Sequence, residues 1–155
     1  MGLFSRTPPA PLPEREDLRR ALKGMHPKDA DRLRSRRHLA DALAAVPETI
    51  SVRAVLSAVI TEPGTSDRGL LCVTPMAVTY DGEHSGRMEF PIAALREVGT
   101  VGAGTVRVEF DELAPGVRAL PGRAAADHMD FSVTARPESV RFFVKQVESA
   151  GGGNR

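Results

Sequence analysis

The side chains best suited to catalysis are few and scattered along the sequence. The 155 residues include one cysteine, Cys72, and four histidines, at positions 26, 38, 84 and 128. No two histidines are three or four residues apart, the spacing that would place both on one helix face as zinc ligands. His128 has Asp127 and Asp130 as neighbours, but no nucleophile motif or phosphate-binding loop accompanies it. The sequence therefore predicts no catalytic, cofactor-binding or metal-binding residue, and we expect no enzyme activity.

Arginines are the other candidates for a site. Four of them, Arg32, Arg34, Arg36 and Arg37, lie within six residues of a predicted helix, and Arg68 follows the first predicted strand. At about 100° per residue the four spread around the helix, as is typical of a solvated helix. The aromatic side chains that accompany cations in single-strand binders are absent, so nucleic acid is not a favoured partner. All five remain candidates for contact with an anionic surface.

Charge divides the chain into two unlike parts. Residues 1–46 contain ten Lys and Arg and six Asp and Glu, a net charge of +4. Residues 47–155 contain eleven and fourteen, a net charge of −3, and the two parts sum to +1. Either the first part has an anionic partner or the two parts attract each other. No stretch has the ~18–20 apolar residues of a membrane span, and no signal peptide is evident, so we expect a cytoplasmic protein.

The first part is expected to contain helices. Residues 1–13 are rich in proline and predict a disordered tail. Residues 14–46 form a basic helical segment, in which Leu18, Ala21, Leu22 and Met25 have the spacing of one helix face. Pro27 is suited to begin a second helix that continues to Val46.

From Ile50 the apolar period changes from helical to alternating, which predicts a sheet over residues 50–149. A turn-rich loop is expected at 62–67, and a closing amphipathic helix begins at Pro137. Residues 150–155 predict a disordered tail. The fold class is therefore α+β, with a bent antiparallel sheet whose open end the last helix covers. The seven predicted strands are 52–60, 69–74, 77–80, 87–90, 96–101, 105–110 and 129–134.

Two segments within residues 54–149 resemble the bacterial pleckstrin-homology-like (PH-like) family, which is related to GRAM-type domains. Gly69-Leu70-Leu71-Cys72-Val73-Thr74, with the turn and strand after it, is similar to a strand–turn–strand of that family. Met88-Glu89-Phe90-Pro91-Ile92, continuing to Val98, is similar to a second family segment. The resemblance covers roughly two-thirds of the chain and implies a seven-stranded sheet with a C-terminal helix. It specifies the architecture better than the ligand.

The resemblance, together with the lack of a catalytic pattern, favours a non-catalytic binding module that acts through protein–protein interaction over an enzyme or a nucleic-acid binder. Lipid-binding PH domains carry several basic residues in the loop after the first strand, whereas this chain has two acidic residues there and Arg68. Weak association of the basic N-terminal segment with an anionic membrane is the alternative. The sequence leaves the oligomeric state and the identity of the partner open.

Overall fold

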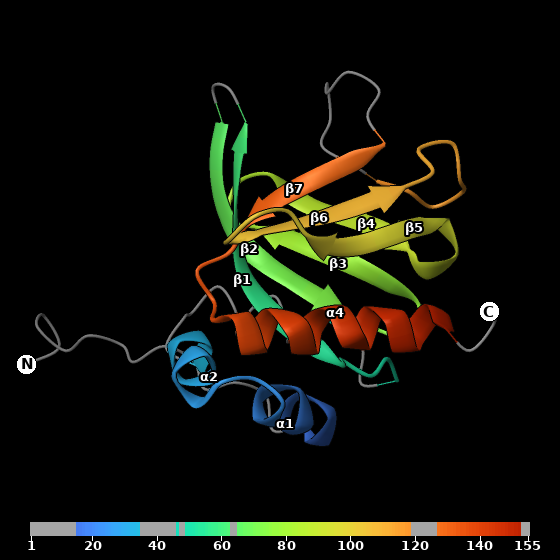
Figure 1. The fold of residues 1–155 in the computed structure, drawn as a ribbon. Coiled ribbons are helices and arrows are strands. Elements are labelled where there is room, and N and C mark those ends of the chain that lie inside the picture. Colours follow the sequence, from blue (N-terminus) through green and yellow to red (C-terminus); the bar gives the residue numbers. More distant parts are fainter. Residues whose placement is uncertain (1–14, 35–45, 47–48, 63–64, 119–126, 153–155) are drawn as a thin grey trace, which may run out of the picture.

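The computed structural model describes residues 15–34, 46, 49–62, 65–118 and 127–152. In these residues, two helices precede a seven-stranded antiparallel sheet and a long helix follows it (Figure 1). The predicted α+β architecture is confirmed. The elements are α1 (Glu16–Lys23), α2 (Pro27–Arg34), β1 (Ala54–Glu62), β2 (Thr65–Val73), β3 (Ala77–Gly82), β4 (Gly86–Pro91), the 3-10 turn η1 (Ile92–Ala94), β5 (Leu95–Thr100), β6 (Thr105–Phe110), β7 (His128–Ser132) and α4 (Pro137–Gly152).

The sheet bends so that its two halves face each other. Its strand order is β4-β3-β2-β1-β7-β6-β5. Tyr80 of β3 contacts Phe131 of β7 with 5.2 Å between ring centroids, although two strands separate β3 from β7. Phe90 of β4 similarly contacts Phe110 of β6 at 4.8 Å. The four rings are buried, and they hold the two halves together by apolar burial and tilted ring contacts.

Helix α4 crosses the lower end of the sheet in Figure 1. It begins at Pro137, whose missing N–H costs nothing in a first turn. Its predicted stripe is confirmed, because Val140, Phe143 and Val147 are buried and Val144 is partly buried against the core. No helix in the described part of the chain is long and apolar enough to cross a membrane.

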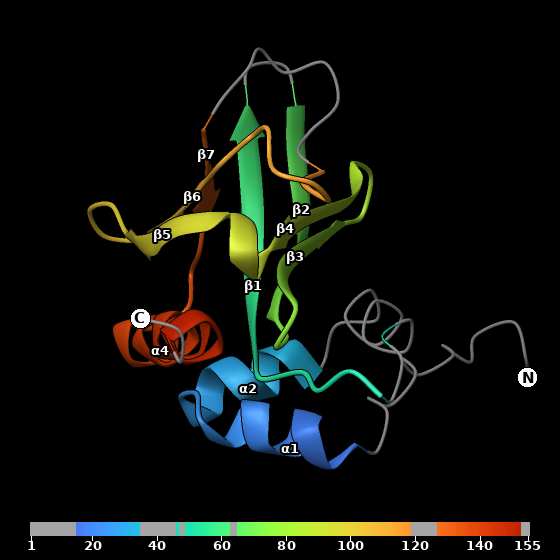
Figure 2. The same cartoon turned by 90° about the vertical axis from the view of Figure 1, so that its right-hand side faces the viewer.

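Helices α1 and α2 pack beneath the sheet beside α4 (Figure 2). The predicted stripe of Leu18, Ala21, Leu22 and Met25 is buried, and α1 contacts β1. Leu33 of α2 is buried as well. The second predicted helix is described only as far as Arg34, and residues 35–45 lie outside the described residues. Val46, the predicted end of this helix, is described and lies in a bend, where it is buried. Over residues 15–34 the helical segment is therefore part of the folded body.

The loop expected at 62–67 is a misprediction. Strand β1 extends to Glu62 and β2 begins at Thr65, so only residues 63 and 64 lie between them. The register remains regular, with Ile60 opposite Asp67 and Val59 opposite Arg68. The polar type of Asp67 made this stretch look like a loop, although the Asp67 side chain points into the protein and is buried. Arg68 is consequently a strand residue and not a loop residue.

Candidate functional site

The structure does not gather the predicted arginines into a single described cluster. Arg32 donates from Nη1 to Thr134 Oγ1 at 3.5 Å, and Arg34 forms an ion pair of 2.9 Å with Asp31 on its own helix. Arg68 is exposed on β2. Residues 36 and 37 lie outside the described residues. The alternative of membrane association depends on those two arginines and on residues 1–14, so it stays a prediction.

A buried carboxylate joins α2 to the start of α4. Asp29 is only 4% exposed. Its Oδ2 accepts hydrogen bonds from the Arg136 N–H at 3.0 Å and the Ser139 hydroxyl at 2.6 Å. Its Oδ1 accepts from Arg136 Nη1 at 3.0 Å. The Ser139 Oγ in turn accepts the His26 N–H at 2.9 Å. These bonds satisfy the Arg136 N–H just before α4 and the Ser139 hydroxyl in its first turn, and they fix the helical segment to the body of the protein.

A second buried carboxylate holds the turn between β3 and β4. Asp67 accepts hydrogen bonds from the Tyr80 hydroxyl at 3.1 Å, the His84 N–H at 2.9 Å and the Ser85 hydroxyl. Its place depends on Gly82, because a Cβ there would lie 1.9 Å from Asp67 Oδ2. The cluster is closed by its own donors, and this points to a structural role.

Acid should unfold the protein through these carboxylates. Burial would raise the pKa values of Asp17, Asp29 and Asp67, but hydrogen bonds outweigh it and hold all three below the ordinary value. The unfolded chain therefore binds protons more readily. Stability should be fully present above about pH 4 and be lost as the pH falls through the lowered folded pKa values. Urea unfolding across an acidic pH series measures this loss.

The variant Asp67→Asn provides the control for the acid prediction. It should be less stable at neutral pH, because an amide replaces a carboxylate that accepts several bonds. It should also lose less stability on acidification, because one titrating group is gone. An unchanged acid slope in this variant would remove Asp67 from the explanation.

The other titratable candidates are either buried in the core or paired with a neighbouring side chain. Cys72 is buried, and burial raises the pKa of its thiol, as fits a core residue. The Nδ1 of His128 lies 3.0 Å from Asp127 Oδ1. Asp130 accepts hydrogen bonds from Arg107 at 2.7 and 3.0 Å. Among the described residues, no group of three or more His, Cys, Asp or Glu side chains could hold a metal ion.

The outer edge of β5 is open at Thr100, which is exposed, whereas Val98 is buried. The Val101 N–H donates to Thr105 O at 3.0 Å, which fixes the alternation of bonds between β5 and β6. Gly99 and Glu97 therefore bond to β6, whereas Val98 and Thr100 direct their N–H and C=O groups outward. These outward groups have no backbone partner in the part of the chain that the structure describes.

The opposite edge of the sheet is partly closed. On β4, the Glu89 N–H donates to Arg118 O at 2.9 Å, and the Arg118 N–H donates to Glu89 O at 2.8 Å. The chain after β6 thus supplies a short extension of the sheet at β4. Glu89 on the β4 edge is thus paired, whereas Thr100 on the β5 edge has no backbone partner among the described residues.

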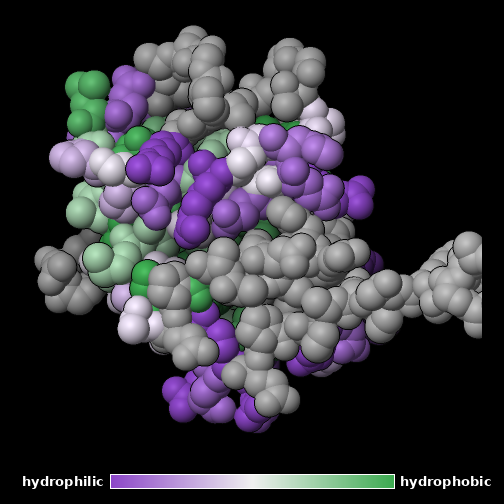
Figure 3. Space-filling view, turned by 180° about the vertical axis from the view of Figure 1, so that it is seen from behind, coloured by the Kyte–Doolittle hydropathy of each residue, from purple (hydrophilic) through white to green (hydrophobic). Residues whose placement is uncertain are grey.

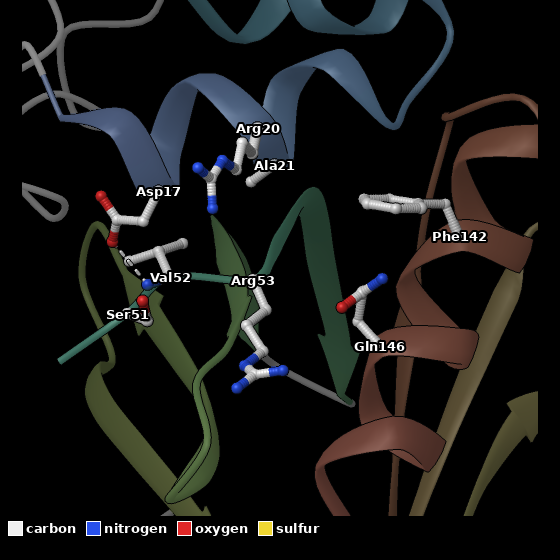
Figure 4. A pocket seen from close by; sticks show the side chains of 8 residues that line it. All are labelled: Asp17, Arg20, Ala21, Ser51, Val52, Arg53, Phe142 and Gln146. Atoms are coloured by element: carbon white, nitrogen blue, oxygen red, sulfur yellow. Dashed lines mark hydrogen bonds between the residues drawn. The ribbon is translucent and has the colours of Figure 1, made fainter.

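A cleft of about 450 Å³ with a mixed polar and apolar lining lies between α1, the segment leading into β1 and α4 (Figure 4). The side chain of Arg20 projects from α1 toward β1. Arg53, the residue directly before β1, lies on the other side of the cleft. On the α4 side the Phe142 ring and the Gln146 carboxamide form the wall. The complete lining is Asp17, Arg20, Ala21, Ser51, Val52, Arg53, Phe142 and Gln146.

Sequence reasoning missed this cleft because three distant segments build it. Arg20 lies among several arginines in the sequence, and only the packing of α1 distinguishes it from Arg19. For Arg53 the sequence did indicate an outward side chain, because Arg53 lies between the apolar residues Val52 and Ala54, which are buried. Nothing in the sequence placed it opposite Phe142.

Comparison with known proteins provides no family for this chain. No protein-family model matches it, and no curated protein matches it. The PH-like resemblance stays a prediction. The functional argument accordingly depends on the geometry of the β5 edge and the cleft.

Proposed function

We propose that this PH-like protein is a non-catalytic binding module that acts by protein–protein interaction. The observation that carries the proposal is the outer edge of β5 at Thr100, an exposed residue whose N–H and C=O groups point away from β6. An extended segment of a partner would pair with this edge and add a strand to the sheet.

The surroundings of β5 limit strand addition to the end of the strand near Thr100, because α4 packs against β5 and Val98 is buried. The edge lies beside α4 in both views of the fold, and α4 contacts β5 (Figures 1 and 2). Val101, directly after the strand, is 42% exposed and offers an apolar contact to an added segment. Each new backbone hydrogen bond would contribute about 0.5–1.5 kcal/mol, so side-chain contacts must supply much of the affinity and the specificity.

A broad apolar interface is a poorer explanation of the described surface. The large apolar side chains exposed there are Met76, Val101 and Leu113, which come from three separate turns. On the face shown in Figure 3, hydrophilic side chains make up much of the coloured surface. Main-chain pairing at an edge needs no large apolar patch.

The substitution Thr100→Pro tests the proposal by removing a single backbone N–H from the edge. It removes an outward N–H and places the proline ring at the edge, while no β5–β6 hydrogen bond is lost. A partner recovered with the wild-type protein in a pull-down should be lost with this variant. Thr100→Ala keeps the N–H and should retain the partner. Equal recovery with both variants, with melting temperatures close to that of the wild type, would refute strand addition at β5.

A further inference from the structure

We propose that the cleft between α1, β1 and α4 binds an acidic segment of a protein partner. The inference rests on the proposed function for the class of partner, but it uses a different surface. The cleft and the β5 edge come from different elements, apart from α4, which contacts both. Each can therefore be altered without changing the other.

The charges around the cleft are incompletely balanced. Its lining contains two guanidinium groups, Arg20 and Arg53, and one carboxylate, Asp17. That carboxylate is already engaged, since it accepts from Arg15 at 2.9 Å and from the Val52 N–H at 2.6 Å. Arg53 is exposed and takes part in none of the ion pairs found among the described residues. An anion entering the cleft would therefore meet donors that remain available.

The carboxylate of Glu16 forms ion pairs with both Arg20 and Arg19. Glu16 lies 3.5 Å from Arg20 Nε and 3.3 Å from Arg19 Nη1. The Arg20 side chain is 78% exposed, so this ion pair is weak and its guanidinium can exchange to another carboxylate. Arg19 has the same partner but does not line the cleft, which makes it a matched control.

The wall on α4 gives the cleft a mixed character. The ring of Phe142 lies against Gly24, where an added Cβ would be 2.1 Å from its Cζ. This contact fixes the ring as an apolar surface, while Gln146 offers an amide beside it. A ligand with carboxylates alternating with small apolar groups matches both the arginines and the ring.

The exposure of the arginines favours a peptide over a small anion. A single contact with a guanidinium as exposed as that of Arg20 contributes little to affinity, because solvent screens it. A segment with several carboxylates makes several such contacts at once, and the exposed Lys23 and Lys145 extend the basic surface beyond the cleft. A flat bilayer is a poorer match, because Phe142 is half-buried in a recess and not on a protruding surface.

The experiment measures the fluorescence anisotropy of a labelled peptide of repeated Glu-Ala units with the full-length protein at low ionic strength. The wild-type protein should bind it, and added salt should weaken the binding because the contacts are screened. Arg20→Gln combined with Arg53→Gln should weaken binding by about tenfold, as expected when two exposed contacts are lost. Arg19→Gln should change it by less than about twofold.

Several results would overturn the proposal. They are an absence of binding to the wild-type protein, equal loss with Arg19→Gln, and displacement by free glutamate or phosphate at concentrations similar to that of the peptide. Tighter binding of an oligonucleotide or of anionic vesicles than of the peptide would also count against it. Thr100→Pro should leave peptide binding unchanged, so failure at the cleft and failure at β5 are distinguishable.

Discussion

Replacing Asp29 by alanine should lower the free energy of unfolding by about 2–4 kcal/mol. The change leaves the Arg136 N–H and the Ser139 hydroxyl without their acceptor, and it leaves the Arg136 guanidinium without its carboxylate. Because Asp29 is only 4% exposed, water cannot fully replace these bonds in the native packing. Urea unfolding at neutral pH measures the loss.

Asp31→Ala is the matched control for this prediction. Asp31 lies on the same helix and forms its ion pair with Arg34 at the surface, where its side chain is 75% exposed. Its removal should cost less than about 0.5 kcal/mol. Equal destabilisation by both substitutions would show that helix propensity, and not the bond to α4, accounts for the effect.

Phe143→Ala should have the larger effect, a loss of about 3–5 kcal/mol. The ring is fully buried between α4 and the sheet, and its removal leaves a cavity that rigid strands cannot close. A lower melting temperature and a lower urea midpoint, with the slope of the transition unchanged, are the expected observations.

The variant Phe142→Ala is the control that distinguishes core packing from a surface contact. Phe142 is only partly buried and lines the cleft, so Phe142→Ala should cost clearly less stability than Phe143→Ala. If the two variants were equally destabilised, the assignment of these rings to the cleft and the core would be wrong.

Much of the architecture follows from local patterns in the sequence. The change of period near Ile50 located the sheet, and Val140, Phe143 and Val147 defined the buried face of α4. Pro27 and Pro137 marked the starts of two helices correctly. These signals are local because the period and the first-turn proline act within a single element.

Features that depend on contacts between distant segments could not be predicted in the same way. Asp67 looked like a loop residue, because its donors Tyr80 and Ser85 come from later strands and turns. The position of Arg20 opposite Phe142 depends on how α1 docks against α4, and no local pattern encodes that. The open edge of β5 likewise follows from strand order and not from the residues of β5.

The bonds of Asp29 also constrain the order of events during synthesis. They join residues 107 and 110 positions apart, and β1 pairs with β7, the last strand to be made. Helices α1 and α2 leave the ribosome first, yet part of their docking surface is translated last. Such distant contacts slow folding, and they delay completion until the C-terminal helix has emerged. A nascent chain that stops before Pro137 would leave the apolar faces of α1 and α2 incompletely covered and open to proteases.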